Sequence, residues 1–183
     1  MARARSFDPR RLDVEAFAAA AGTLEGELAQ STLERLGAAV LPWPGDSAAA
    51  PVLWRASGER RAVTGGAPET WLHLQASTTV RLECQRCLQP MAEPLAVDRR
   101  FRFVADEDQA AVLDEASEDD VLVASHSFDL AALIEDELIL ALPLVPRHPA
   151  CPEPLPVTPD AGADEAAPNP FAALAALRRP GSE

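Results

Sequence analysis

The chain contains no lysine and no tyrosine, and it is poor in aromatic residues. All 16 basic residues among its 183 are arginines, only 5% of the residues are aromatic, and Ala, Leu and Val supply most of the apolar volume. An aliphatic core is therefore expected. At this length the chain can bury roughly two thirds or more of the surface that its unfolded form exposes, so one domain of ordinary size is the simplest prediction.

Long hydrophobic runs are also missing. The first eleven residues carry four arginines without an apolar stretch behind them, and no window approaches the ~18 consecutive apolar residues of a membrane span. We therefore expect a cytoplasmic protein with no membrane contact. The chain has three cysteines, an odd number. Without an export signal this argues against a disulfide framework, so the thiols should be reduced and free to bind metal.

The net charge of −13 is concentrated in the second half of the chain. Residues 1–104 contain 13 arginines and 12 acidic residues, whereas residues 105–183 contain 3 arginines and 17 acidic residues. Basic side chains drive nonspecific binding to phosphates, so such an acidic chain should bind bulk RNA poorly. RNA contact would require the N-terminal half or a protein intermediary. The alternative is that the acidity only maintains solubility.

Hydrophobic periodicity predicts an α+β fold, a twisted and mainly antiparallel sheet packed by a few helices. The clearest strand is 70–83, where polar and apolar residues alternate, and a second strand at 95–104 should pair with it in antiparallel fashion. Further expected elements are a helix over 7–21 capped by Asp8, a strand at 23–29, a short helix ending at Leu36, a loop at 41–51 and a hairpin formed by 52–57 and 60–64.

A helix over 128–142 should cover one face of this sheet. Asp129 can cap it, and Leu130, Leu133 and Leu138 belong to an apolar stripe, which predicts that Glu135 to Glu137 face water.

The composition of the remaining segments predicts that they are mobile. Residues 105–120 hold eight acidic residues and no basic one, a composition typical of a mobile acidic loop. Eight prolines between 143 and 168 predict an extended, mobile, Pro-rich C-terminal tail, followed by a short amphipathic helix at 170–179. We therefore expect a single domain over 1–148, with the acidic loop at 105–120, and a tail over 149–183.

A C-x2-C motif, Cys84 and Cys87, lies in the turn between the two strongest strands, and His148 and Cys151 follow the last predicted helix of the domain with H-x2-C spacing. A C-x2-C turn can place two thiolates on one tetrahedral metal, so the four residues would make a Cys3His site for a structural zinc ion. Two alternatives remain open: the cysteines are small, partly buried residues, or they form a redox pair. Redox C-x-x-C motifs usually precede a helix in a βαβ unit, whereas this one joins two strands.

Five arginines of the same hairpin form a candidate surface for RNA or a partner protein: Arg81, Arg86, Arg99, Arg100 and Arg102. A solvated, arginine-rich strand face explains them equally well, because aromatic residues for base stacking are not interleaved with them. No hydrolase, metalloprotease, nucleotide-binding or dinucleotide-binding motif occurs, so we expect no enzymatic activity, no catalytic residues and no small-molecule substrate.

Three blocks of the sequence together resemble the YceD family of large ribosomal RNA subunit accumulation proteins. They read VRLECQRCLQP at 80–90, FDL at 128–130 leading to IEDELILALPLVPRH at 134–148, and NPFAALAAL at 169–177. The resemblance covers about the last 110 residues in the order and spacing of its blocks. The first 70 residues share only a pattern of helix, strand and helix.

The resemblance implies a non-enzymatic accessory role in the synthesis, processing or stability of 23S ribosomal RNA. Partners would be the 23S rRNA precursor, ribosomal proteins or an rRNA-processing factor. Some relatives carry more cysteines after the helix, which suggests a complete zinc site, whereas this chain offers His148 and Cys151 there. The alternatives are a metal-dependent or thiol enzyme that uses the C-x2-C hairpin, and a protein adaptor that never contacts RNA.

Overall fold

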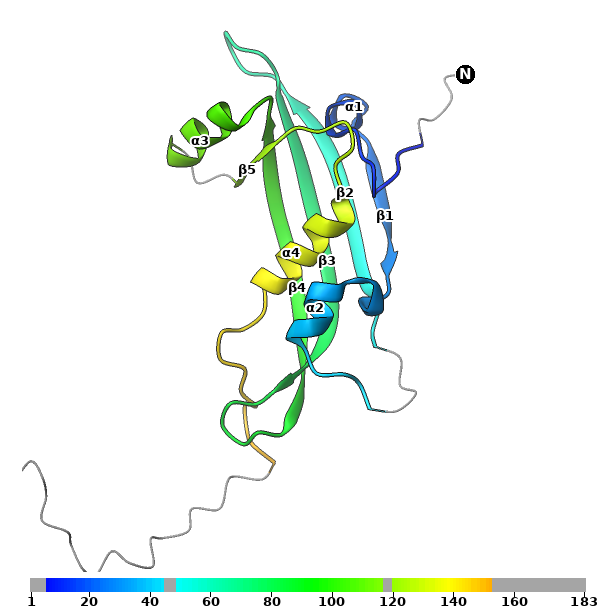
Figure 1. Cartoon of the computed structure of the whole chain (residues 1–183). Coiled ribbons are helices and arrows are strands. Elements are labelled where there is room, and N and C mark those ends of the chain that lie inside the picture. The colour runs from blue at the N-terminus through cyan, green and yellow to red at the C-terminus, as the bar shows by residue number, and fades with distance from the viewer. Residues whose placement is uncertain (1–5, 45–48, 117–119, 153–183) are drawn as a thin grey trace, which may run out of the picture. The chain divides into compact units, whose positions relative to one another are not determined.

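The computed structural model describes residues 6–44, 49–116 and 120–152. Within them the chain forms five strands and four α-helices (Figure 1). The strands are β1 (Thr23–Leu28), β2 (Val52–Arg61), β3 (Glu69–Glu83), β4 (Pro90–Val104) and β5 (Asp120–Val123). The helices are α1 (Val14–Ala19), α2 (Glu34–Ala39), α3 (Glu107–Ala116) and α4 (Leu130–Leu140), with a 3-10 turn at Gln30–Thr32 before α2.

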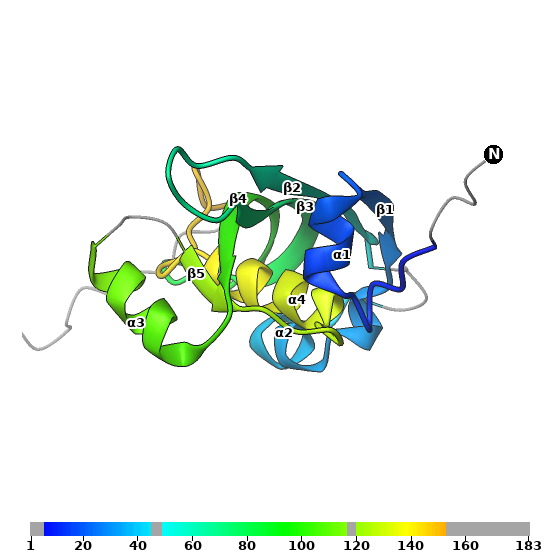
Figure 2. The same cartoon turned by 90° about the horizontal axis from the view of Figure 1, so that it is seen from above.

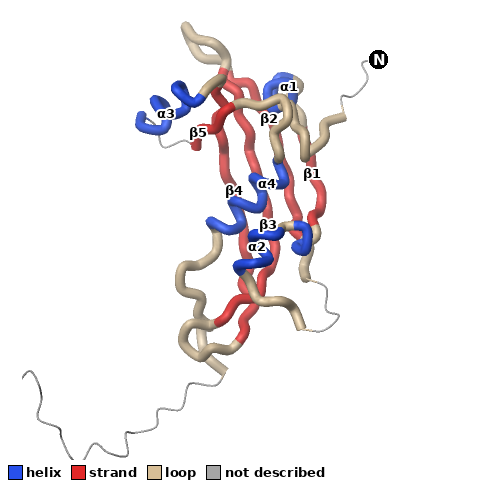
Figure 3. The backbone as a smooth tube through the Cα atoms, viewed as in Figure 1, coloured by secondary structure: helices blue, strands red, loops and turns tan. Residues whose placement is uncertain are grey.

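The strands follow one another across a single sheet in the order β1-β2-β3-β4-β5. The first four pair antiparallel, and β5, which follows α3, pairs parallel to β4 (Figure 3). The predicted α+β class with a mainly antiparallel sheet is therefore confirmed.

Helices α1, α2 and α4 lie on one face of the sheet (Figure 2). Helix α1 packs on β2 and β3, α4 packs on β3 and β4, and α2 packs beside α4. Alternation along each strand directs the apolar side chains to this face, where Phe17, Leu74 and Ile134 are among the fully buried residues. The opposite face carries the polar set of β1 to β4, and none of the helices in the described residues covers it.

The β3–β4 hairpin matches the prediction and is longer than expected. Its register runs from Thr70 opposite Phe103 to Glu83 opposite Pro90, so β4 begins five residues earlier than the expected start at residue 95. The cysteine-containing turn therefore lies at the end of the two longest strands.

The hairpin predicted over 52–64 is wrong, because β2 runs unbroken through Gly58 and pairs with β3. Gly58 is needed where α1 approaches the sheet: a Cβ built on it would lie 2.8 Å from the Cα of Ala18. Glycine inside a strand often marks such a close approach of another backbone. The residue that suggested a turn is thus a packing site for α1.

The acidic loop predicted over 105–120 is also wrong in its described part, which contains α3 and the start of β5. Asp106 accepts a hydrogen bond from the amide of Gln109 (2.9 Å), and Glu107 and Asp108 occupy the first turn. Negative charge at a helix N-terminus stabilises the helix through its dipole, so acidic residues favour this helix rather than opposing it.

At the N-terminus the first helix begins later than predicted. Asp13, rather than Asp8, caps α1 by accepting a hydrogen bond from the amide of Ala16 (2.9 Å). The preceding residue, Leu12, forms an isolated β-bridge with Phe128. The predicted tail beyond residue 152 and the helix at 170–179 lie outside the described residues.

The expectation that Glu135 and Glu137 face water is wrong, since each residue is only 8% exposed. The Glu135 carboxylate accepts hydrogen bonds from the backbone amides of Arg35 (2.7 Å) and Leu36 (3.1 Å), and from the Arg35 guanidinium. It therefore links the N-terminal turn of α2 to α4.

None of the helices in the described segments has the length and apolar character that crossing a bilayer requires.

Replacing Glu135 with alanine should lower the free energy of unfolding at neutral pH by roughly 2 kcal/mol, because two amides and a guanidinium lose a charged acceptor. Urea denaturation measures this. Asp136→Ala is the matched control: this carboxylate also pairs with Arg35 but is half exposed, so about 1 kcal/mol or less should be lost.

The same residue predicts a pH dependence. Burial opposes ionisation of Glu135, but the hydrogen bonds from Leu36 and Arg35 outweigh burial and lower its pKa. Its stabilisation is thus complete above the unfolded pKa of about 4.3 and is lost as the pH falls through the lower folded pKa. The difference between wild type and Glu135→Ala should shrink in acid, and a difference that stays constant with pH would contradict this role.

Candidate metal centre

The turn that joins β3 to β4 places Cys84 and Cys87 on its inner side. The amide of Cys84 donates to the carbonyl of Gln89 (3.0 Å), and the amide of Leu88 donates to the carbonyl of Cys84 (2.8 Å). Leu88 completes the turn with a left-handed backbone (φ +58°). Both cysteines are buried, with exposed fractions of 0% and 3%. The tight turn therefore brings two thiols close together, as the C-x2-C spacing predicts.

The second half of the cluster comes from the segment that follows α4. This segment runs from the end of the helix to the β3–β4 turn (Figure 1). The amide of Gln85 donates to the carbonyl of Pro146 (2.9 Å), and the amide of His148 donates to the Cys84 sulfur (3.4 Å). These backbone contacts place His148 and Cys151 against the turn, and the compact part of the chain extends to Cys151.

One ligand atom from each of Cys84, Cys87, His148 and Cys151 lies within 4.8 Å of the other three. The Cys84 and Cys151 sulfurs are 3.9 Å apart, and the Cys87 sulfur is 3.4 Å from His148 Nδ1. Tetrahedral zinc, with bonds of about 2.3 Å to sulfur and about 2.0 Å to nitrogen, separates neighbouring ligand atoms by about 3.5 to 3.8 Å. The four side chains therefore fit a zinc ion and could bind a metal together.

The cysteine environment favours the thiolate at Cys84. Burial opposes the charged form, but hydrogen bonds from the backbone amides of His148, Arg86 and Cys87 outweigh it and lower the Cys84 pKa to about 5. The pKa of Cys87 is raised, mainly by burial, with a contribution from the neighbouring sulfurs of Cys151 and Cys84. Thiolates are the form that ligates metals, so the backbone amides around Cys84 favour its ligating form.

Arg86, in the middle of the turn, faces the same cluster. Its Nε donates to the Cys151 sulfur (2.9 Å), and its Nη2 donates to the carbonyl of His148 (3.1 Å). These contacts with Cys151 raise the pKa of Arg86. Three thiolates and a divalent ion would carry a net charge of −1, which one guanidinium offsets. In the sequence, the contact of Arg86 with Cys151 is indicated only by the position of Arg86 between the two cysteines of the turn.

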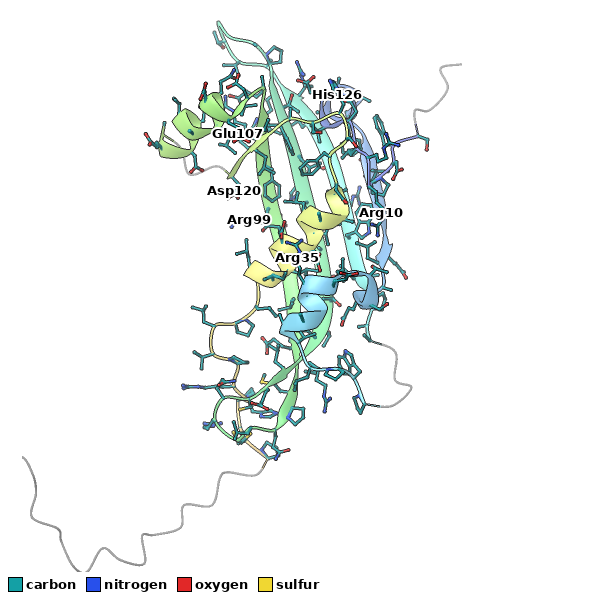
Figure 4. The ribbon with its side chains drawn as sticks, viewed as in Figure 1. Arg10, Arg35, Arg99, Glu107, Asp120 and His126 are labelled. Carbon is teal, nitrogen blue, oxygen red and sulfur yellow. The ribbon has the colours of Figure 1, made fainter. Side chains whose placement is uncertain are left out.

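The other four arginines of the candidate surface lie elsewhere. The side chain of Arg81 donates to the carbonyl of Pro42, and Arg102 pairs with Glu69 (2.8 Å). Arg99 pairs with Asp120 (2.6 Å), as Figure 4 shows at the edge of the sheet. Arg100 is exposed and lies near Asp98, where its charge helps to lower the Asp98 pKa behind the larger effects of Gln75 and His73.

The register shows that these arginines do not form one patch. Arg81 lies opposite Ala92 on β4, whereas Arg100 lies opposite His73, eight residues further along β3 or about 26 Å. Arg99 lies on the helix-covered face, because it alternates with Arg100 and Asp98. Only Arg100 and Arg102 are close neighbours on the open face, so the structure separates the set that the sequence grouped.

Taken together, the fold and the cluster define a class: an α+β protein in which a C-x2-C turn at the end of a long hairpin meets an H-x2-C segment that follows a covering helix. The family model described as large ribosomal RNA subunit accumulation protein YceD matches residues 72–178, more than half of the chain. The chain belongs to the YceD family.

Among curated proteins, the chain is similar to the large ribosomal RNA subunit accumulation protein YceD of Haemophilus influenzae. The two are 41% identical over 107 residues, which is 55% of this chain and 60% of that protein. The match thus spans less than two thirds of the length of that relative. No solved structure gives a significant match.

Proposed function

We propose that the protein acts as a non-enzymatic accessory factor in the accumulation of large-subunit ribosomal RNA, through the synthesis, processing or stability of the 23S molecule. The observation that carries this proposal is the family match over residues 72–178, which includes the whole of β4, the cysteine-containing turn and α4. The Haemophilus relative, whose name refers to accumulation of the large ribosomal RNA subunit, is 41% identical over 107 residues, which supports this proposal.

We further propose that Cys84, Cys87, His148 and Cys151 hold a structural zinc ion. Bound zinc would supply a cross-link between the β3–β4 turn and the segment after α4. With four protein ligands the tetrahedral site is closed, which leaves no position for an activated water and favours this role over that of a hydrolase. The residues of the chain would position the turn, and Arg86 would offset the negative charge of the thiolates.

RNA contact is proposed for the open face of the sheet, at Arg100 and Arg102. Arg100 is the better candidate, because it is exposed while Arg102 is largely covered and pairs with Glu69. Arg81, Arg86 and Arg99 have intramolecular partners that RNA would have to displace. Partners of the whole protein would be the 23S rRNA precursor, a ribosomal protein or a processing factor.

Metal analysis of the purified full-length protein should find about one zinc per chain, since the four donors form one tetrahedral site. Cys84→Ser and His148→Ala should each lose most of the metal and lower the thermal midpoint, because metal binding and folding are coupled. His126→Ala, at an exposed histidine outside the cluster, is the matched control and should keep full metal content. If zinc is removed from the wild-type protein and its thermal midpoint does not change, the zinc assignment is refuted.

Arg86→Gln tests whether this side chain supports the metal centre or is instead a contact for RNA or a partner protein. If the guanidinium offsets the charge of the metal centre, the variant should release zinc to a chelator about tenfold more readily, as loss of a supporting contact around a metal site typically does. Arg100→Gln removes the same charge from an exposed strand position and should leave zinc release unchanged. Equal zinc release from both variants and the wild type would exclude the charge-offsetting role.

Deleting the gene should lower the ratio of 23S to 16S ribosomal RNA, and a plasmid copy should restore it. Complementation with Arg100→Glu, after its stability has been checked by thermal denaturation, tests the open face. A stable variant that fails to restore the ratio supports recognition through this face, whereas full restoration favours an adaptor without RNA contact there. A normal ratio in the deletion strain would reject the process itself.

A further inference from the structure

One edge of the sheet is open beside the C-terminal end of α4. Strand β5 pairs only with Phe101–Val104, so within the described residues the earlier part of β4 has no strand partner on this side. A groove of about 280 Å³ lies there, between residues 96–99 of β4 and Glu137, Leu140 and Ala141 of the helix end. In Figure 1 the last turn of α4 extends past this edge of the sheet.

The direction of the backbone groups shows which part of this edge can accept another strand. The amide of Ala124 donates to the carbonyl of Val104 (2.7 Å), so the backbone of Val104 points towards the β5 side. Alternation then directs the backbone groups of Arg100, Asp98 and Ala96 to the same side. Pro94 also falls in this register and has no N–H, which protects the earlier edge from pairing. The β4–β5 ladder starts at Phe101 and Asp120, so it already uses the carbonyl of Arg100. The open backbone groups are therefore those of Ala96 and Asp98 and the N–H of Arg100, within residues 96–100.

Glu137 supplies a charge that the protein itself compensates only weakly. Its side chain is 10% exposed, and its ion pair with Arg99 Nε is long, at 3.8 Å. Arg99 in turn pairs closely with Asp120 (2.6 Å). Burial raises the pKa of Glu137, and Asp120 and Asp136 raise it further against the opposing effect of Arg99. A largely buried carboxylate with so distant a counter-charge costs free energy, and a cation from a partner would lower that cost.

The groove also presents an apolar side chain to solvent, since Leu140 is 75% exposed. The groove combines three features: strand-edge backbone groups that have no strand partner in the part of the chain that the structure describes, a carboxylate on the helix side, and an exposed leucine one helical turn further on. Phosphate fits poorly, because the groove is lined by two carboxylates, Asp98 and Glu137, and its one arginine, Arg99, already pairs with Asp120.

We propose that this groove binds an extended, basic segment of a partner protein, which pairs with β4 at residues 96–100 and places a lysine or arginine near Glu137 and an apolar side chain on Leu140. Strand addition of this kind takes affinity from backbone hydrogen bonds and specificity from alternate side chains. The proposal goes beyond the role in rRNA accumulation and does not depend on the metal centre, so either can fail alone.

The test uses the full-length chain and a fluorescein-labelled peptide that repeats lysine-threonine-leucine-threonine, which places lysine and leucine on one side of an extended strand. Fluorescence anisotropy should show binding, and the amide NMR signals of residues 96–100 should shift. A peptide with glutamate in place of lysine should not bind. Shifts confined to other residues would overturn the proposal.

Glu137→Gln should weaken peptide binding about tenfold, equivalent to about 1.4 kcal/mol. The variant removes a poorly compensated charge from the protein, so its thermal midpoint should not fall. Glu115→Gln, which removes the same charge from the exposed helix α3, should leave the affinity within about twofold, because exposed charges contribute little. Equal weakening by both variants would show diffuse charge attraction and overturn the site.

Leu140→Asn provides a second, independent variant, because this side chain is already exposed and its replacement by a neutral polar residue leaves the core and the net charge intact. It should also weaken binding, and unchanged affinity would overturn the apolar half of the proposal. An oligouridine probe should not shift the signals of residues 96–100. If it did, the groove would be a nucleic-acid site and the protein-segment proposal would fail.

Discussion

The long antiparallel pairing of β3 with β4 is the constraint on which the rest of the molecule depends. Side chains alternate between faces, so the register from Thr70–Phe103 to Glu83–Pro90 decides which residues meet the helices and which meet solvent. A slip by one residue would exchange the buried set, such as Leu72 and Leu74, with its polar neighbours. The same register ends at Glu83, immediately before Cys84, so it also fixes where the two thiols of the turn lie.

Helix α4 connects this hairpin to the cysteine cluster. Asp129 caps its N-terminus by accepting hydrogen bonds from Ala131 and Ala132, and Glu135 links it to α2. The chain then leaves the helix and reaches the turn through the contact of Pro146 with Gln85. The position of His148 and Cys151 thus depends on the packing of α4, so a metal held by the proposed site would be coupled to core stability.

The sequence predicts most accurately what local periodicity encodes. Alternation identifies β3, the Asp129 cap identifies α4, and C-x2-C spacing identifies the two thiols of the turn, all of which the structure contains. Composition was less reliable. Gly58 suggested a turn because nothing local indicates that α1 approaches it, and the acidic run suggested a loop although Glu107 and Asp108 suit a helix N-terminus.

Long-range contacts are not predicted either, because nothing in the local sequence indicates them. Neither the hydrogen bonds between Glu135 and α2, which join residues about 100 positions apart, nor the contact of Arg86 with Cys151 leaves a local pattern. The five arginines of the candidate surface lie close together in the sequence. Strand alternation and pairing then separate them, because neighbours along a strand lie on opposite faces and distant positions are far apart.

The charges of the sheet bear on how such a protein can take part in RNA metabolism. On the open face, Glu25, Arg55, Gln75 and Asp98 form one row across four strands, so one arginine lies there in a row with two carboxylates and an amide. A phosphate backbone would meet this mixed row and, at Arg102, an ion pair that must first be broken. Breaking an existing ion pair to form a phosphate contact cancels much of the electrostatic free energy gained from that contact. A net charge of −13 adds a long-range repulsion. These terms favour the proposed binding of a basic protein segment, and they would confine any direct RNA contact to a few exposed side chains such as Arg100.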